Sequence, residues 1–109
     1  MFNAKAVLVE KSNDGWTDSD VIINSVDDIR NCFKFEIAEV RIDKYRRLYY
    51  TISEDGVQAK IKDEDGNMHY MSSPLLIVQC DDEKPINISN NILNSIKETI
   101  DFFWVSSYN

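Results

Sequence analysis

The sequence predicts an α+β protein: an antiparallel sheet of about five to six strands containing a β-meander, with a short helix and a C-terminal amphipathic helix packed on one face. Three observations predict this class. Apolar and polar residues alternate over much of residues 36–71, which is the period of a strand. The dipeptides Asp55-Gly56 and Asp65-Gly66 interrupt the alternation, and Asp-Gly is a strong hairpin signal because both residues tolerate positive φ. Near the C-terminus, apolar residues recur at helical spacing.

The N-terminal third predicts one strand and one short helix. Residues 2–9 alternate as a strand does, and a turn is expected at residues 13–15, which read Asn-Asp-Gly. Residues 16–24 are expected to form a loop that leads into a short apolar run. Ser25 is a suitable N-cap with acidic residues directly after it, so a helix is predicted over residues 26–34.

Residues 36–47 are ambiguous. Ala38, Val40 and Ile42 alternate with charged residues, which indicates a strand. The segment also contains good helix formers, so a continuing helix is the alternative. We favour the strand, because residues 48–52 alternate clearly.

The two Asp-Gly turns predict a three-stranded meander over residues 48–71. Residues 72–74, Ser-Ser-Pro, are expected to end it, and the apolar run 75–78 predicts a strand buried on both faces. The core-facing residues of the meander are expected to be Leu48, Tyr50, Ile52, Val57, Ala59, Ile61, Met68 and Tyr70.

A charged loop at residues 81–85 precedes the longest predicted helix, which Ser89 or Asn90 would cap. Its apolar stripe is complementary to the core-facing side of the meander, so this helix is expected to cover the sheet. The stripe comprises Ile88, Ile92, Ile96, Ile100 and Phe103, with Leu93 and Trp104 beside it.

Composition limits the functional classes. A length of 109 residues predicts a single domain, residues 1–109. The net charge of −7, from 19 acidic and 12 basic residues, disfavours nucleic acid and anionic membranes as partners. It favours a basic protein partner through electrostatic steering, although the same charge also serves solubility alone.

Cys32 and Cys80 are far apart in the sequence and lie on apolar faces, so free thiols are expected rather than a disulfide. The N-terminal residues do not resemble a signal peptide, and no apolar stretch approaches the ~20 residues of a membrane helix. These observations predict a cytoplasmic protein.

The sequence predicts no enzyme, cofactor or metal. His69 is the one histidine and is expected to be exposed on a strand, with no nucleophile motif beside it. Asp63, Asp65 and Asn67 match the opening of a calcium loop, but Pro74 stands where a bidentate Glu is required. Acid–base catalysis by a pair of carboxylates is an alternative. However, the acidic residues cluster at predicted turns, where exposure to solvent leaves the pKa of a carboxylate near its ordinary value.

Three acidic runs lie at or beside predicted turns, and they are the predicted partner-binding residues: Glu54, Asp55, Asp63, Glu64, Asp65, Asp81, Asp82 and Glu83. Trp16 and Tyr49 are added as candidate anchors, since Trp and Tyr dominate binding hot spots. Trp16 is expected at the surface and Trp104 in the core. The alternative is that the charged turns only solubilise hairpins and protect sheet edges.

Together, the helix at Ser25–Phe33, the strand at Tyr49–Ile52 and the acidic hairpins at residues 54–56 and 63–66 resemble small bacterial immunity proteins. These include the immunity proteins of contact-dependent growth inhibition and polymorphic toxin systems. The resemblance implies a cytosolic inhibitor that binds one cognate toxin domain, commonly a nuclease, and covers its basic active site. The alternatives are an acidic adaptor or accessory subunit of a larger assembly, and a DNA-mimic inhibitor.

Overall fold

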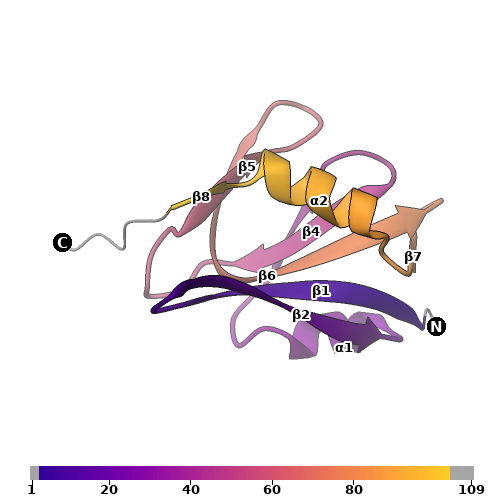
Figure 1. The fold of residues 1–109 in the computed structure, drawn as a ribbon, viewed down its shortest axis with the longest axis horizontal. Helices are drawn as coiled ribbons and strands as arrows, with labels where there is room; N and C mark the ends of the chain where they lie inside the picture. Colours follow the sequence, from indigo (N-terminus) through magenta and orange to yellow (C-terminus); the bar gives the residue numbers. More distant parts are fainter. Residues whose placement is uncertain (1–2, 104–109) are drawn as a thin grey trace.

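The computed structural model describes residues 3–103 and has a mixed α+β architecture (Figure 1). Its sheet is larger than predicted, with eight strands and two helices in the described part of the chain. In chain order the elements are β1 (Ala4–Ser12), β2 (Gly15–Ile23), α1 (Val26–Asn31), β3 (Ala38–Arg41), β4 (Arg46–Thr51), β5 (Ala59–Lys62), β6 (Met68–Asp81), β7 (Lys84–Ile86), α2 (Asn90–Thr99) and β8 (Asp101–Phe102).

The strand pairs are antiparallel, and the main path of the sheet runs β2-β1-β6-β4-β3. Strand β7 pairs with the end of β6, whereas β5 pairs with its beginning and carries β8 on its other side. None of the helices in residues 3–103 is long and apolar enough to cross a membrane.

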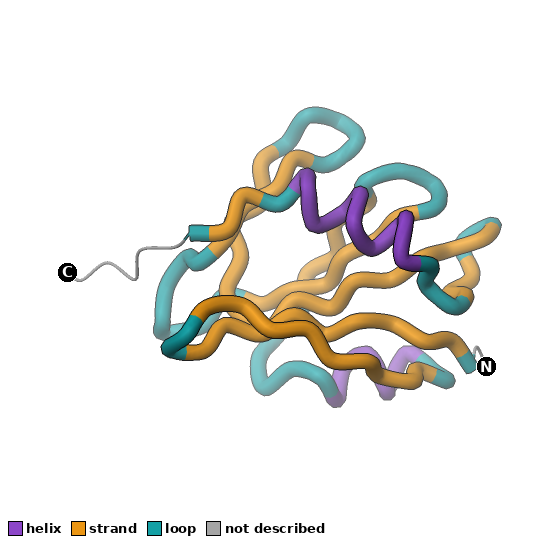
Figure 2. Tube along the Cα trace, in the orientation of Figure 1, coloured by secondary structure: helices purple, strands orange, loops and turns teal. Residues whose placement is uncertain are grey.

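Strand β6 divides the core into two layers. Leu75 and Ile77 belong to one buried cluster, and the alternating residues Leu76 and Val78 belong to the other, so this segment is buried on both faces as predicted. Helix α2 packs into the first cluster and α1 into the second. The prediction that both helices pack on one face is therefore wrong: they lie on opposite sides of the sheet (Figure 2), because a strand that is apolar on both faces needs a cover on each.

The predicted turn at residues 13–15 joins β1 to β2, but the loop expected over 16–24 is wrong. Strand β2 pairs with β1 along its whole length, from Ser12↔Gly15 to Ala4↔Ile23. Residues 17–20 are polar and exposed. The backbone ladder therefore determines this strand, and the sequence carries no apolar alternation to signal it.

Helix α1 begins where predicted and ends early, at Asn31 rather than at residue 34. The Ser25 side chain caps it by accepting a hydrogen bond from the backbone N–H of Asp28. Residues 36–47 contain strand and no helix, as we favoured, but the strand is interrupted: β3 spans Ala38–Arg41, and Arg46 and Arg47 already belong to β4. A turn held by the Asp43 carboxylate, which accepts from the backbone N–H groups of Tyr45 and Arg46, leads into β4.

The predicted meander is half correct. The Asp65-Gly66 turn joins β5 and β6 as a hairpin. The Asp55-Gly56 turn exists, with the Gly56 N–H donating to the carbonyl of Ser53, but it does not join paired strands, because β4 pairs with β3 and β6. Ser72 and Ser73 do not end a strand either. Their hydroxyls accept from the backbone N–H groups of Ser53 and Lys11, so β6 continues while it exchanges one partner strand for another.

The core-facing side was predicted correctly on β4 and β5 and wrongly on β6. Leu48, Tyr50, Ala59 and Ile61 are buried, whereas Ile52, Val57, Met68 and Tyr70 are exposed. The register pairs Ile61 with His69 and Ala59 with Met71, so β6 turns its odd-numbered residues to the core. The length of the turn between β5 and β6 sets this register. A turn shorter or longer by one residue would bring the even-numbered residues of β6 to the core instead.

Ser89, one of the two predicted caps, caps helix α2. Its hydroxyl accepts a hydrogen bond from the backbone N–H of Ile92. Ile88, Ile96 and Ile100 are buried in the first cluster. The helix ends at Thr99, before the predicted Phe103, because Ile100 is extended and the next residues pair with β5 as β8. The prediction for Trp104 lies outside the described residues.

Candidate functional site

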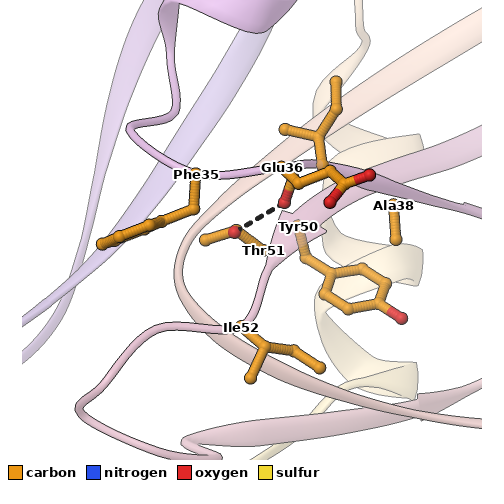
Figure 3. Close-up of a pocket in the computed structure, with 7 residues that line it drawn as sticks. Phe35, Glu36, Ala38, Tyr50, Thr51 and Ile52 are labelled. Carbon is orange, nitrogen blue, oxygen red and sulfur yellow. Dashed lines mark hydrogen bonds between the residues drawn. The ribbon is translucent and has the colours of Figure 1, made fainter.

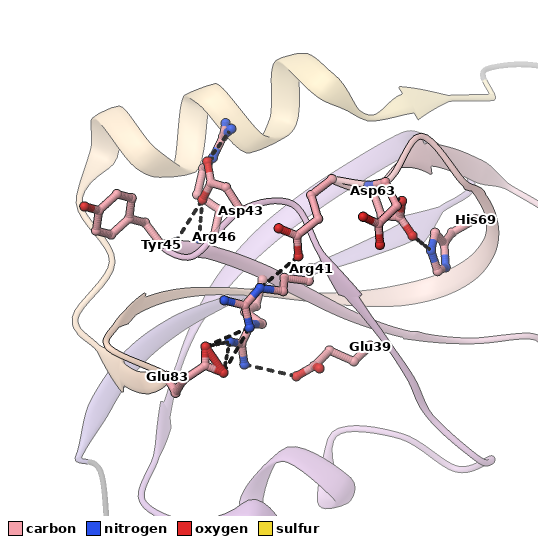
Figure 4. Close-up of polar contacts among 11 residues, drawn as sticks. Glu39, Arg41, Asp43, Tyr45, Arg46, Asp63, His69 and Glu83 are labelled. Carbon is pink, nitrogen blue, oxygen red and sulfur yellow. Dashed lines mark hydrogen bonds and ion pairs between the residues drawn. The ribbon is translucent and has the colours of Figure 1, made fainter.

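Arg41, the last residue of β3, binds two of the predicted acidic turns together. Its Nε lies 2.8 Å from a carboxylate oxygen of Glu64, and its Nη1 lies 2.7 Å from one of Glu83. The carbonyl of Arg41 also accepts a 3.0 Å hydrogen bond from the backbone N–H of Glu64. The turns at residues 63–67 and 81–84, which are distant in the sequence, therefore meet at one guanidinium (Figure 4).

A second arginine, Arg47 of β4, supports this arrangement from below the surface. Its side chain is only 8% exposed, and its Nη2 donates to both carboxylate oxygens of Glu83 at 2.7 and 2.8 Å. Its Nη1 lies 3.3 Å from the carboxylate of Glu39, which also accepts a 2.9 Å hydrogen bond from the Tyr49 hydroxyl. Hydrogen bonds from Arg47 and Arg41 lower the pKa of Glu83, so this carboxylate stays ionised well below neutral pH.

Carboxylates outnumber guanidinium groups here. Asp65 follows Glu64 in the sequence, and Asp81 and Asp82 precede Glu83. All three aspartates are exposed and make no ion pair with the described residues. We call this region the acidic clamp surface, and it comprises Glu39, Arg41, Arg47, Glu64, Asp65, Asp81, Asp82 and Glu83. Its arginines fix the position of the turns and leave part of the negative charge uncompensated.

Asp63 belongs to the same turn but has a structural role. Its Oδ1 accepts hydrogen bonds of 2.9 Å from the backbone N–H groups of Asp65 and Asn67. Its Oδ2 lies 2.9 Å from Nε2 of His69, and this contact, followed by the backbone bonds, lowers the pKa of the Asp63 carboxyl. These contacts account for Asp63 as a turn residue without any partner.

The sequence predicted that His69 is exposed on a strand, but its side chain is only 21% exposed. It lies opposite the buried Ile61 on the core side of β6, between Asp63 and the hydroxyl of Tyr50, which lies 3.1 Å from its Nδ1. Burial raises the pKa of Tyr50, so its hydroxyl stays protonated at neutral pH and is a poor nucleophile. Among residues 3–103 no group of His, Cys, Asp or Glu side chains is arranged to hold a metal ion.

The third acidic run lies elsewhere. Glu54 and Asp55 are exposed at the turn after β4, and Asp55 lines a pocket of about 410 Å³ together with Cys32, Phe35 and Pro74. Cys32 and Cys80 are free thiols, as predicted, and burial raises the pKa of both. The three acidic runs therefore form two separate regions: the acidic clamp surface and the surroundings of Phe35.

A groove that the sequence did not reveal runs along the start of β3 and the end of β4 (Figure 3). Its volume is about 600 Å³, and two apolar side chains beside it, Phe35 and Ile52, are 53% and 62% exposed. The Thr51 hydroxyl donates a 2.7 Å hydrogen bond to the carbonyl of Glu36 and so joins its two walls. The groove is lined by Phe35, Glu36, Ile37, Ala38, Tyr50, Thr51 and Ile52.

The two predicted aromatic anchors are both half-buried. The Trp16 ring packs on Phe102 with ring centroids 4.8 Å apart, so this residue is part of the fold rather than the surface residue expected. Tyr49 packs on the second core cluster and presents only its hydroxyl to Glu39. Tyr45 is more exposed than either and carries the Lys44 ammonium 5.1 Å from its ring centre.

Comparisons of the chain with protein-family models, with curated proteins and with solved structures found no match.

Proposed function

We propose that this chain is an immunity protein that binds a basic toxin domain, a nuclease, and covers its active site with the acidic clamp surface. The observation that carries the proposal is that Arg41 joins two acidic turns at one point. Charges held in place before binding lose little conformational freedom when a partner docks. Asp65, Asp81 and Asp82 remain exposed there, without an ion pair among the described residues, to attract a basic surface.

The ion pairs of the clamp support a binding role rather than solubilisation alone. Turns that serve only solubility need no shared counter-ion, and isolated surface ion pairs contribute little to stability. Here Glu83 is bound by two arginines, one of them nearly buried. A nuclease cleft must hold phosphate and is therefore basic, so it is complementary to such a surface.

The test uses the polypeptide encoded by the gene beside that of this chain as the binding probe, titrated at low and at physiological salt. The triple variant Asp65→Asn, Asp81→Asn and Asp82→Asn removes three exposed charges, and Asn tolerates the positive φ of Asp82. We expect about tenfold weaker binding at low salt and a flatter salt dependence, corresponding to about 1.4 kcal/mol.

The matched control is Asp14→Asn, Asp20→Asn and Glu98→Gln, which removes the same charge from the β1–β2 hairpin and α2. If both triple variants weaken binding equally, net charge alone is responsible and the clamp surface is not the site. If the neighbouring polypeptide does not bind and the chain instead co-purifies with a stable assembly, the adaptor alternative replaces this proposal.

A further inference from the structure

Strand β3 forms one end of the main path of the described sheet, and its backbone groups face alternately toward β4 and away from it. The Ile42 N–H donates to the carbonyl of Arg46, so even-numbered residues face β4. The carbonyl of Arg41 instead accepts from Glu64, so odd-numbered residues face outward. The N–H and C=O of Glu39 therefore point away from the sheet, and no strand of residues 3–103 pairs with them.

The two sides of this edge differ in chemistry. Glu39 lies opposite Tyr49 in the register, on the face that carries Arg47 and Glu83 of the acidic clamp surface. Ala38 lies opposite Tyr50, on the face of the apolar groove, and Figure 3 shows Ala38, Tyr50 and Ile52 together there. The side chains of a strand added beside β3 would therefore face, in turn, the Glu39 carboxylate and the apolar groove.

We infer that the outer edge of β3 accepts an extended segment of the basic partner by strand addition. The segment carries Lys or Arg at the positions beside Glu39 and apolar side chains at the alternate positions, which enter the groove beside Phe35 and Ile52. Backbone hydrogen bonds to Glu39 supply affinity, and the two-sided side-chain pattern supplies specificity. The Glu64 N–H already occupies the Arg41 carbonyl and so limits the added strand to the start of β3.

This inference rests on the proposed function and names the way in which the partner docks. The paired variants Glu39→Pro and Glu39→Gln test it in the full chain. Both remove the carboxylate charge, but only proline also removes the outward N–H. Proline is tolerated at an edge strand whose N–H faces solvent, so the fold is expected to persist. We expect Glu39→Pro to bind the neighbouring polypeptide about tenfold more weakly than Glu39→Gln does.

A second measurement does not depend on folding of the proline variant. The probe is a short acetylated peptide of alternating Lys and Val, compared with the same peptide N-methylated at its edge-facing amides. The unmodified peptide is expected to slow hydrogen exchange at the amide of Glu39, and the methylated one to leave it unchanged. Equal protection by both peptides, or equal binding by the two Glu39 variants, overturns strand addition.

The two proposals fail in different ways. If the Asn triple variant loses the partner while Glu39→Pro binds as well as Glu39→Gln, the immunity function stands and the edge is not used. If the neighbouring polypeptide never binds but the Lys-Val peptide protects Glu39, the edge accepts a basic strand and the proposed function is wrong.

Discussion

Nη2 of Arg47 donates hydrogen bonds to both carboxylate oxygens of Glu83, at 2.7 and 2.8 Å. Arg47 lies on β4 and is nearly buried, whereas Glu83 lies at the tip of the β6–β7 turn with positive φ. The contact attaches an exposed acidic turn to the interior of the sheet. It is both a structural contact and the support of the proposed binding surface.

Glu83→Gln is expected to lower the free energy of unfolding. The change leaves the nearly buried Arg47 with Glu39 alone as a charged partner, and the loss is limited because Glu83 itself is exposed to solvent. Urea unfolding measures it, with Glu98→Gln in α2 as the matched control. If the two variants are equally stable, the pair contributes nothing and the turn is held by its backbone.

Asp63→Asn is expected to reduce the loss of stability in acid. The folded-state pKa of Asp63 lies below its ordinary value of 3.8, chiefly because of the His69 contact. Its contribution is therefore fully present above about pH 4 and is lost as the pH falls through the folded-state pKa. Unfolding free energies measured between pH 5 and pH 2 should fall less steeply for the variant. An identical slope in both proteins would show that the His69 contact does not favour the ionised carboxylate.

Alkaline destabilisation is expected to involve Tyr49. Burial, followed by the charge of Glu39, raises the folded-state pKa of Tyr49 above its ordinary value of 10.0. The unfolded chain ionises first as pH rises, so stability is fully present below about pH 10 and falls above it. Tyr49→Phe should show a smaller decrease between pH 9 and pH 11. Tyr70→Phe is the control, because Tyr70 is half exposed, and a smaller decrease in that variant instead would contradict the assignment.

Ile96→Ala is expected to cost about 2–5 kcal/mol of stability. Its side chain is fully buried between α2 and the sheet, so the substitution leaves a cavity. Asn94→Ala, at an exposed position of the same helix, is expected to change stability by less than about 0.5 kcal/mol. Thermal or urea unfolding of both variants measures the difference. Comparable small effects would mean that α2 does not cover this face.

The elements that the sequence predicted well have a local cause. Ser25 and Ser89 cap helices by bonding to a backbone N–H three residues on, and Asp65-Gly66 turns a hairpin within a few residues. The elements that were missed depend on distant partners. The middle of strand β2 consists of polar residues that β1 pairs. Strand β6 passes through Pro74 because the hydroxyls of the two preceding serines bond to β1 and to the segment that follows β4.

For the candidate site, the sequence showed which acidic residues lie at turns but not which side chains they contact. It could not show that Asp63 bonds to His69, or that Glu64 and Glu83 share Arg41. The arginines of residues 41–47 lay in the stretch that was ambiguous between strand and helix, so no face could be assigned to them. The groove beside Phe35 also depends on the meeting of β3 and β4.

The sequence by itself determined the α+β class, the position of the charged turns, the helix caps and the strand that is buried on both faces. These features follow from contacts within a few residues and from apolar periodicity. The tertiary structure alone decided which strands pair, which face of β6 points inward and which acids are neutralised. Those outcomes depend on register and on side chains that meet across long sequence separations, and a shift of one residue reverses them.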